Sequence, residues 1–443
     1  MQRQAHGRYR SAALIAAAFL AIFGLSARLY LLSVSGNLSV GPLSGTGDQV
    51  RYQTLAESVF RGDGFTYARQ PTALRAPAYP ILLAALHLVF GSHYFLAMRI
   101  LQLTASLLLA FASLRLAKRL FGEEAGLLAG GFALALPTLI FIENELQTEA
   151  LAALLTGLFL LAALDVFERQ KSSPVSLGIY SGLSALLRFN EALLVVFAVA
   201  GLLLRDRSIK RAVIVGGIAG LIVLPWLIRN EIAFHGRVLY STHGGINLLE
   251  GVLTPQGRAQ ADEAPAVKHA VGWEHADIET NTDWRFRFPS EDVLNRQARA
   301  AAWTAWLALD WKSRVRLLYS KVVWFWLGTD QLLSTASFAK RQRYLRAAGV
   351  IIYWSVLSCA LLGWRRLFDK RKDLAWAIAL YCFAITLAHL PFVMNTRLRI
   401  PFIDPLLVVL AGGGVSALFD KAARLISPER YIDSTECTTA NAI

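Results

Sequence analysis

The feature that most constrains this chain is a series of long apolar runs that recurs from residue 11 to residue 420. A helix needs about 17 to 25 mostly apolar residues to cross the hydrocarbon core of a membrane, and most of the runs have this length. Hydrophobic residues make up 55% of the 443 residues and charged residues only 17%, so lipid is the solvent for most of the chain. Backbone groups in lipid must pair within their own segment. The sequence therefore predicts an all-α polytopic membrane protein.

The basic residues indicate how the runs are oriented. A formal net charge of +14 would suit a nucleic-acid partner, but the basic residues fall in short clusters between apolar runs rather than in one patch. Such clusters typically mark the cytoplasmic ends of membrane spans. The clusters are the N-terminus, 118–119, Arg169 with Lys171, 205–211, 365–372, and Lys421 with Arg424. The three cysteines show neither a disulfide framework nor a zinc spacing.

Ten crossings fit these clusters and leave both termini cytoplasmic, with the first as an uncleaved anchor. The predicted spans are 11–32, 93–116, 124–141, 147–167, 175–188, 191–204, 211–228, 347–363, 374–393 and 402–419. Two of them, 175–188 and 191–204, are short for a crossing and predict a tight helical hairpin. The apolar stretch 76–91 is also short, and we expect it to form a helix packed at the outer membrane surface.

The spans divide the chain into four parts. These are an N-terminal transmembrane module (1–228) with a first outer loop (33–75), an extracytoplasmic loop or cap with interfacial helices (229–346), C-terminal transmembrane helices (347–420), and a cytoplasmic tail (421–443). The tail is polar and without apolar periodicity, so we expect it to be disordered. A crossing at 322–333 is an alternative that would move nearby basic residues inside, but it would expose the cluster 365–372.

Charged and aromatic residues gather in the first outer loop and just after it. Asp48 opens a stretch in which apolar residues repeat at helical spacing, which predicts an amphipathic helix on the membrane surface. Tyr52 follows one turn later, and the segment 75–80 reads Arg-Ala-Pro-Ala-Tyr-Pro. The Asp48 carboxylate caps the helix in one interpretation and takes part in catalysis in the other.

In this order and approximate spacing the chain resembles the GT-C superfamily of glycosyltransferases that use polyprenyl-phosphate sugars. That group includes the protein O-mannosyltransferases, the lipid A aminoarabinose transferase ArnT and the Rgt-type core glycosyltransferases. The resemblance covers nearly the whole chain and implies a GT-C-type bundle of about ten transmembrane helices with outer juxtamembrane helices and a small extracytoplasmic cap. Many members carry Asp-Glu where this chain has Asp48 and Gln49, which weakens any metal-site analogy.

The resemblance assigns two acidic residues to the reaction. Asp48 is the candidate base for the proton of an acceptor hydroxyl, and its carboxylate would equally suit holding an acceptor or a divalent cation. Glu149 follows Thr148 at the outer start of a span, where the family commonly shows a Thr-Glu facing the same cavity. A favourable charge at a helix N-terminus is the plain alternative for Glu149. No nucleotide cofactor is expected, because no Walker or dinucleotide fingerprint is present.

Arginines at the outer ends of spans are the candidates for holding the phosphate of the donor, because guanidinium groups give bidentate, permanently charged contacts. Arg397 and Arg399 resemble the Arg-x-Arg-x-Pro element of the family, with snorkelling to the interface as the alternative. Arg229 and Arg75 complete this set. The residues expected in the substrate pocket are Tyr52, Tyr79 and Asn247.

Together these residues predict a hexosyl- or pentosyltransferase that moves a sugar from a polyprenyl-phosphate donor to a glycan, lipid or protein hydroxyl by inverting single displacement. The predicted location is a bacterial inner membrane, with the site on the extracytoplasmic face. A multi-span lipid or solute transporter is the main alternative, but transporters place ionisable residues near the membrane midplane, whereas the candidates here lie at outer helix ends. An inactive GT-C-like partner subunit is a third hypothesis, which Gln49 keeps open.

Overall fold

The described part of the chain is helical apart from one two-stranded hairpin. The computed structural model describes residues 2–34, 47–67, 69–143, 146–168, 173–254, 290–328 and 343–426, so the predicted tail lies outside it from residue 427 on. The first helices are α1 (Gln2–Val34), α2 (Gly47–Phe60), α3 (Ala78–Phe90), the 3-10 turn η1 (Gly91–His93), α4 (Tyr94–Phe121), α5 (Glu123–Ala135), α6 (Pro137–Glu143) and α7 (Glu149–Phe167). Strands β1 (Thr66–Tyr67) and β2 (Gln70–Pro71) pair antiparallel between α2 and α3.

The second half of the chain continues the helical pattern. Its elements are α8 (Pro174–Leu187), η2 (Phe189–Ala192), α9 (Leu193–Leu204), α10 (Ile209–Phe234), α11 (Gly244–Leu253), α13 (Glu291–Ala308), α14 (Trp311–Leu327), α15 (Arg343–Lys370), α16 (Lys372–His389), η7 (Thr396–Leu398) and α17 (Asp404–Ile426). The prediction of an all-α membrane protein is confirmed.

Six described helical segments are long and apolar enough to cross a membrane, and the number is seven if the bent pair α5 and α6 forms one span. The six are Ser11–Leu31, Ala78–Phe121, Glu149–Phe167, Ile209–Phe234, Ala347–Lys370 and Asp404–Ala422. Each of the ten predicted spans falls on a helix, but α8 and α9 are short, and α16 begins with the charged residues Lys372 and Asp373. The stretch 76–91, which we expected as a separate surface helix, forms α3 and leads through η1 into α4.

Proline and polar caps set several helix ends. Pro137 separates α5 from α6, which meet at 45° because proline has no amide donor and crowds the preceding turn. Ser173 accepts a backbone hydrogen bond and Pro174 occupies the first turn, so α8 begins there. Asp310 caps α14 in the same way. The bend at Pro137 matters for the site, because α6 leads into the turn before Glu149.

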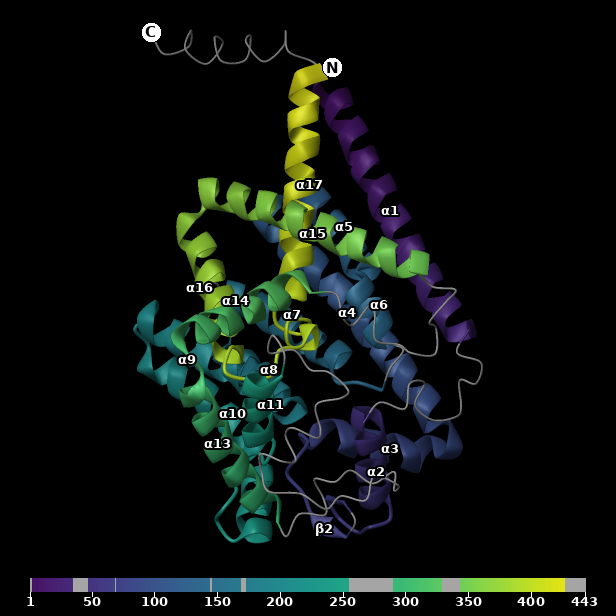
Figure 1. The fold of residues 1–443 in the computed structure, drawn as a ribbon. Coiled ribbons are helices and arrows are strands. Elements are labelled where there is room, and N and C mark those ends of the chain that lie inside the picture. The colour runs from purple at the N-terminus through teal and green to yellow at the C-terminus, as the bar shows by residue number, and fades with distance from the viewer. Residues whose placement is uncertain are drawn as a thin grey trace.

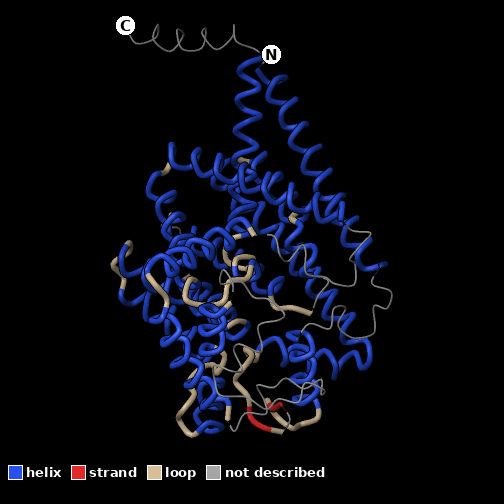
Figure 2. The backbone as a smooth tube through the Cα atoms, viewed as in Figure 1, coloured by secondary structure: helices blue, strands red, loops and turns tan. Residues whose placement is uncertain are grey.

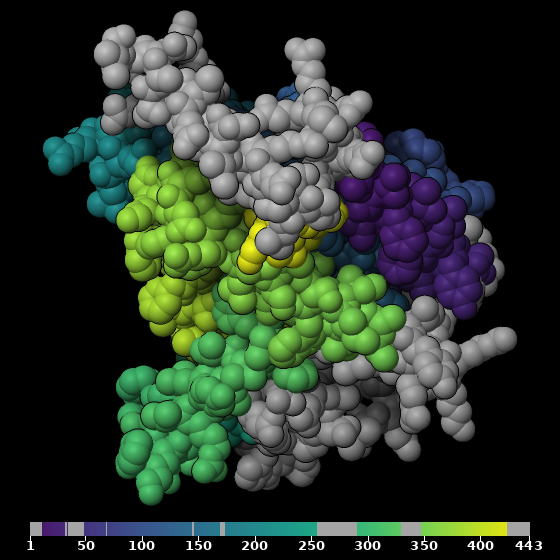
Figure 3. All heavy atoms as spheres, turned by 90° about the horizontal axis from the view of Figure 1, so that it is seen from above, coloured from purple at the N-terminus to yellow at the C-terminus, as the bar shows by residue number. Residues whose placement is uncertain are grey.

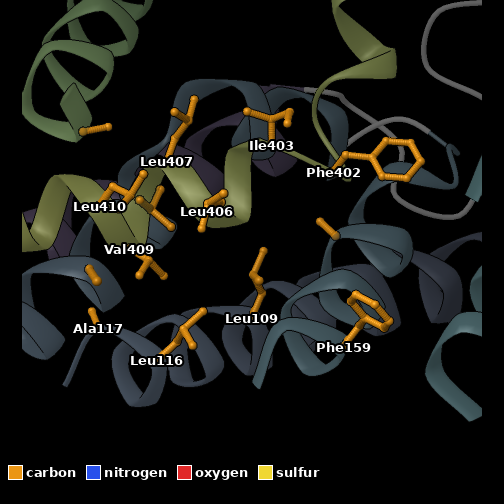
Figure 4. Close-up of a cluster of buried hydrophobic side chains, with 14 of the residues drawn as sticks. Leu109, Leu116, Ala117, Phe159, Phe402, Ile403, Leu406, Leu407, Val409 and Leu410 are labelled. Atoms are coloured by element: carbon orange, nitrogen blue, oxygen red, sulfur yellow. The ribbon is translucent and has the colours of Figure 1, made fainter. Parts of the chain in front are cut away.

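Helix α17 lies at the centre of the largest hydrophobic core. In the space-filling view of Figure 3, α1 (purple) and α15 (light green) flank α17 (yellow). Figure 4 shows side chains of α17 (Leu406, Leu407, Val409 and Leu410) and of the residues just before it (Phe402 and Ile403) together with Leu109, Leu116 and Ala117 of α4 and Phe159 of α7. Lipid is as apolar as these side chains, so close packing rather than water exclusion holds such helices together.

Glycines bring α15 and α17 into close contact. A Cβ atom on Gly363 would lie 1.8 Å from the Leu410 carbonyl oxygen, and one on Gly414 would lie 2.0 Å from the Cys359 carbonyl oxygen. These distances leave no room for a larger side chain, so only glycine permits this packing.

The elements of the first loop lie at one end of the molecule. Figure 1 shows the start of α1 and the end of α17 together at the top, whereas α2, β2 and α13 lie toward the bottom. Figure 2 shows the short strands, in red, at this lower end. The helices therefore place α2 and the hairpin β1–β2 at the opposite end from the start of α1 and the end of α17.

Candidate active site

Asp48 lies in the first turn of α2, where it contacts three arginines from different parts of the chain. Its Oδ1 atom pairs with Arg75 Nη2 and lies 3.4 Å from Arg51 Nη1. Its Oδ2 atom accepts a hydrogen bond from Arg397 Nη1 at 2.8 Å. The Asp48 side chain remains 27% exposed. An accessible carboxylate is therefore surrounded by guanidinium groups from the first loop and from η7.

These arginines decide the charge of Asp48. Burial alone would raise the pKa of its carboxyl, but Arg75, Arg397 and Arg51 outweigh burial and hold the pKa well below its usual range. The pKa of the Arg397 guanidinium is raised in return, because Glu149 and Asp48 outweigh the opposing effect of its burial. Asp48 is consequently ionised and Arg397 is a cation at neutral pH.

Glu149 is the second carboxylate of the cluster, and it is wholly buried. Its Oε1 atom receives Arg397 Nε at 2.7 Å and Arg188 Nη1 at 2.8 Å. Arg397 thus bridges Asp48 and Glu149, and its Nη2 atom donates to Gln147. All three nitrogens of this guanidinium are used, and they fix its plane within the site.

Arg188 and Gln147 are the site residues that the sequence did not single out. Arg188 ends α8, where its Nη1 atom also donates to Thr148 Oγ1 at 2.8 Å. Its Nε atom lies 3.5 Å from the buried carboxylate of Glu191. Two charged residues within four positions, between apolar helices, were a usable signal, because ionisable groups in such surroundings are usually paired or functional.

Two tyrosines form an aromatic wall beside the cluster. The rings of Tyr52 and Tyr79 lie 4.9 Å apart between centroids and are tilted by 56°. Tyr79 donates its hydroxyl to Gln102 at 2.8 Å, and Gln102 donates to the Glu143 carbonyl at 3.0 Å. Burial and the nearby Asp48 carboxylate raise the pKa of Tyr52, so its hydroxyl keeps its proton. The motif around residues 75–80 thus supplies both an arginine and a ring to one site.

Arg399, expected to hold phosphate, lies apart from this cluster. Its guanidinium is wholly buried, pairs with Asp404 at 2.9 Å and donates to the Phe325 carbonyl at 3.0 Å. It also lies over the Tyr353 ring, 4.3 Å from the centroid. Thr138 donates to the other Asp404 oxygen at 2.7 Å. These contacts join α14, α15 and α17, so Arg399 acts on the fold and we leave it out of the proposed site.

Replacing Arg399 with alanine should therefore destabilise the protein strongly. The change leaves the Asp404 carboxylate buried without its cation, which typically costs about 3–5 kcal/mol. Arg365→Ala on α15 is the matched control, because its ion pair with Asp369 is exposed and such pairs contribute at most about 1 kcal/mol. Thermal unfolding in detergent solution measures both. Equal midpoints for the two variants would contradict the structural role of Arg399.

Arg229 and Asn247 also lie beside the cluster rather than in it. Arg229 donates to the carbonyl oxygens of Thr72, at 2.8 Å, and of Phe65. The Asn247 carbonyl oxygen accepts a hydrogen bond from the Val393 amide at 2.9 Å. Both residues therefore support the segments that carry Arg75 and Arg397, whereas we expected them to contact substrate.

A divalent cation does not fit Asp48 as the structure places it. Both carboxylate oxygens already face guanidinium groups, which would repel a metal ion. Among the described residues, no three His, Cys, Asp or Glu side chains group as a metal site needs. In formal charge the cluster is positive, because it joins four arginines (Arg51, Arg75, Arg188 and Arg397) to three carboxylates (Asp48, Glu149 and Glu191).

Comparisons with known proteins bear on the family and the fold. Residues 74–228 match the family model of the dolichyl-phosphate-mannose-protein mannosyltransferases. A comparison with curated protein sequences gave no match. The oligosaccharyltransferase AglB of Archaeoglobus fulgidus, solved with an inhibitory peptide and a dolichol-phosphate, is similar with a TM-score of 0.51 at 14% identity over 96% of this chain and 52% of AglB. The same enzyme with Zn and sulfate gives 0.51 at 16% identity over 93% of this chain and 51% of that one.

ArnT from Cupriavidus metallidurans bound to undecaprenyl phosphate gives a TM-score of 0.39 at 15% identity, over 89% of this chain and 77% of ArnT. This chain spans about half the length of AglB, and the likeness to AglB concerns the fold. The matched segment 74–228 begins next to Arg75 and includes Tyr79, Glu149 and Arg188. The family match over residues 74–228 and the fold shared with AglB confirm the resemblance of this chain to the GT-C superfamily in that segment and in its fold.

Proposed function

We propose that this protein transfers a sugar from a polyprenyl-phosphate donor to a hydroxyl group of a glycan, lipid or protein, on the extracytoplasmic face of a bacterial inner membrane. The observation that carries the proposal is the position of Asp48, a partly exposed carboxylate between Arg75 and Arg397. A base and two phosphate ligands in direct contact suit a reaction that takes a proton from one reactant and releases an anion from the other.

In the proposed reaction the acceptor hydroxyl attacks the anomeric carbon while Asp48 takes its proton. The new bond joins the acceptor oxygen to that carbon, and the bond between the carbon and the phosphate oxygen breaks. The phosphate leaves on the lipid with one more negative charge, which Arg75 and Arg397 stabilise. One displacement of this kind inverts the anomeric configuration.

The resting contacts of Asp48 suggest how its basicity changes during the reaction. In the free protein the arginines keep its pKa low, which makes it a weak base. A donor phosphate that draws Arg75 and Arg397 toward itself removes part of this effect and raises the basicity of Asp48. Glu149, which is itself paired with Arg188, keeps its contact with Arg397 Nε meanwhile, so the phosphate replaces only the contact of Arg397 Nη1 with Asp48.

The experiment that tests this function is an analysis of products. Purified protein in lipid nanodiscs receives an undecaprenyl-phosphate sugar labelled on the sugar, together with candidate acceptors. We expect labelled acceptor and free undecaprenyl phosphate in equal amounts, with inverted configuration at the anomeric carbon. A transporter would move the donor across the bilayer and leave its sugar–phosphate bond intact, which would contradict the proposal.

The pH dependence should differ between the free protein and the donor complex. The value of kcat/KM follows ionisation in the free protein. Because the pKa of Asp48 is held below its usual range of about 3.9, kcat/KM should stay level from neutral pH down to about pH 5. The acid limb of kcat should lie at higher pH, because phosphate then competes for the arginines. Initial rates over this pH range check both, and a kcat/KM limb near neutral pH would assign the base to another group.

A further inference from the structure

Glu291 begins α13, far along the chain from the first loop, yet its carboxylate holds the segment that carries Arg75. The Glu291 Oε2 atom accepts hydrogen bonds from the Ala73 amide at 3.0 Å and from Thr242 Oγ1 at 2.7 Å. The Thr242 amide donates in turn to the Ala73 carbonyl at 3.2 Å. Ala73 is therefore bound through both of its backbone groups, two residues before Arg75.

The residues on either side of Ala73 are held as well. The Thr72 carbonyl accepts from Arg229 at 2.8 Å, and the Leu74 amide donates to Thr72 Oγ1 at 3.1 Å. All three residues are buried, and none of them belongs to a helix or strand. The position of this segment thus depends on side chains from α10, α13 and the Thr242 loop, of which Glu291 is the acidic one.

The pair of helices α11 and α13 also contacts the segment before Arg397. The two helices share a small core of Ile246, Leu249, Leu294, Ala298 and Ala302. Gly251 of α11 lies against the backbone of the segment 391–393, where an added Cβ would come within 2.6 Å of the Phe392 carbonyl carbon. One unit therefore contacts the two chain segments that precede Arg75 and Arg397.

We propose that Glu291 is a positioning residue that acts through Ala73 on Arg75. The α11–α13 unit then helps to set the positions of Arg75 and Arg397 around Asp48, where the donor phosphate would bind. The proposal rests on the proposed function only in naming phosphate as the ligand. It has one distinguishing consequence: removal of Glu291 should lower sugar transfer only in a protein that still has Arg75.

The test compares two neighbouring acids on the first turn of α13. Glu291→Ala removes the acceptor of Ala73, whereas Asp292→Ala removes a carboxylate that pairs with Arg296 at 2.8 Å and Arg237 at 3.8 Å. Both changes remove one negative charge from the same helix end. We expect Glu291→Ala to raise the donor KM about tenfold, since small misplacements of a binding group are costly, and Asp292→Ala to leave it within about twofold. Glu291→Gln keeps an acceptor oxygen and should restore the KM to within about threefold.

A double variant distinguishes an effect of Glu291 on the position of Arg75 from a general loss of protein stability. If Glu291 acts through Arg75, Glu291→Ala combined with Arg75→Ala should be no slower than Arg75→Ala alone, because coupled residues are not additive. Multiplied losses would overturn the proposal. Amide hydrogen exchange of the peptide 65–75, measured without donor, should be faster in Glu291→Ala than in Asp292→Ala. Unchanged exchange would also overturn it, whereas faster exchange in a protein that transfers no sugar would refute only the proposed function.

Discussion

Replacing Asp48 with asparagine should lower kcat for sugar transfer by about a hundredfold to ten-thousandfold, the range that general base catalysis contributes. Asparagine keeps the shape of the side chain, and its carbonyl oxygen still accepts a hydrogen bond from Arg75 or Arg397. It cannot take the proton of the acceptor. Transfer from a labelled undecaprenyl-phosphate sugar, at saturating donor, measures the effect, and donor binding should change much less than kcat.

Asp63→Asn is the matched control for this variant. Asp63 follows α2 in the same outer loop, but its carboxylate is about half exposed and pairs with an exposed arginine, Arg61, at 3.2 Å. Its transfer rate should equal that of the unchanged protein. Equal transfer by Asp48→Asn would remove Asp48 as the base. If neither the variant nor the unchanged protein transfers sugar, the hypothesis of an inactive partner subunit, which Gln49 motivated, gains support.

Much of the fold follows from the sequence because lipid imposes a simple rule on it. A long apolar run in lipid has to be a helix, so each of the ten predicted spans falls mostly on helical residues, although only six or seven of the described segments are long and apolar enough to cross. A helix must be long enough as well as apolar to cross the membrane. The hairpin α8–α9 remains short because Arg188 and Glu191 interrupt it, and a helix end is a stable place for buried charges that pair there.

The candidate site was only partly predictable, because pairing across the chain has no local signal. Asp48 and Arg75 stand in one motif, but Arg397 reaches Asp48 from 349 residues away. Arg397 and Arg399 look alike in the sequence. They are two residues apart on a turn, so they point to different sides, and Arg399 faces Asp404 instead. Arg188 and Glu191 gave a local signal of paired charges, but the contact of Arg188 with Glu149 was not predictable, since Glu149 is on another helix.

Replacing Arg397 with glutamine should lower transfer at least about a hundredfold and also destabilise the protein. The variant removes a cation from the buried Glu149 carboxylate and from Asp48, and breaking a buried pair typically costs about 3–5 kcal/mol. Arg397→Lys should recover only part of either property. Its ammonium is a point charge and does not reproduce the three contacts to Asp48, Glu149 and Gln147. Thermal unfolding and donor KM measure the two effects.

A compensating change then separates the two roles of Arg397. Glu149→Gln combined with Arg397→Gln removes the buried carboxylate that has lost one of its two cations. Arg188, the other cation, still lies 3.5 Å from Glu191, so the thermal midpoint should return part of the way to that of the unchanged protein. Sugar transfer should remain low, because Arg397 is still missing as a ligand of the donor phosphate. Asp48 also still lacks the cation that the phosphate would draw away from it. If the double variant recovers transfer together with stability, Arg397 serves only the fold, and Arg75 alone holds the phosphate.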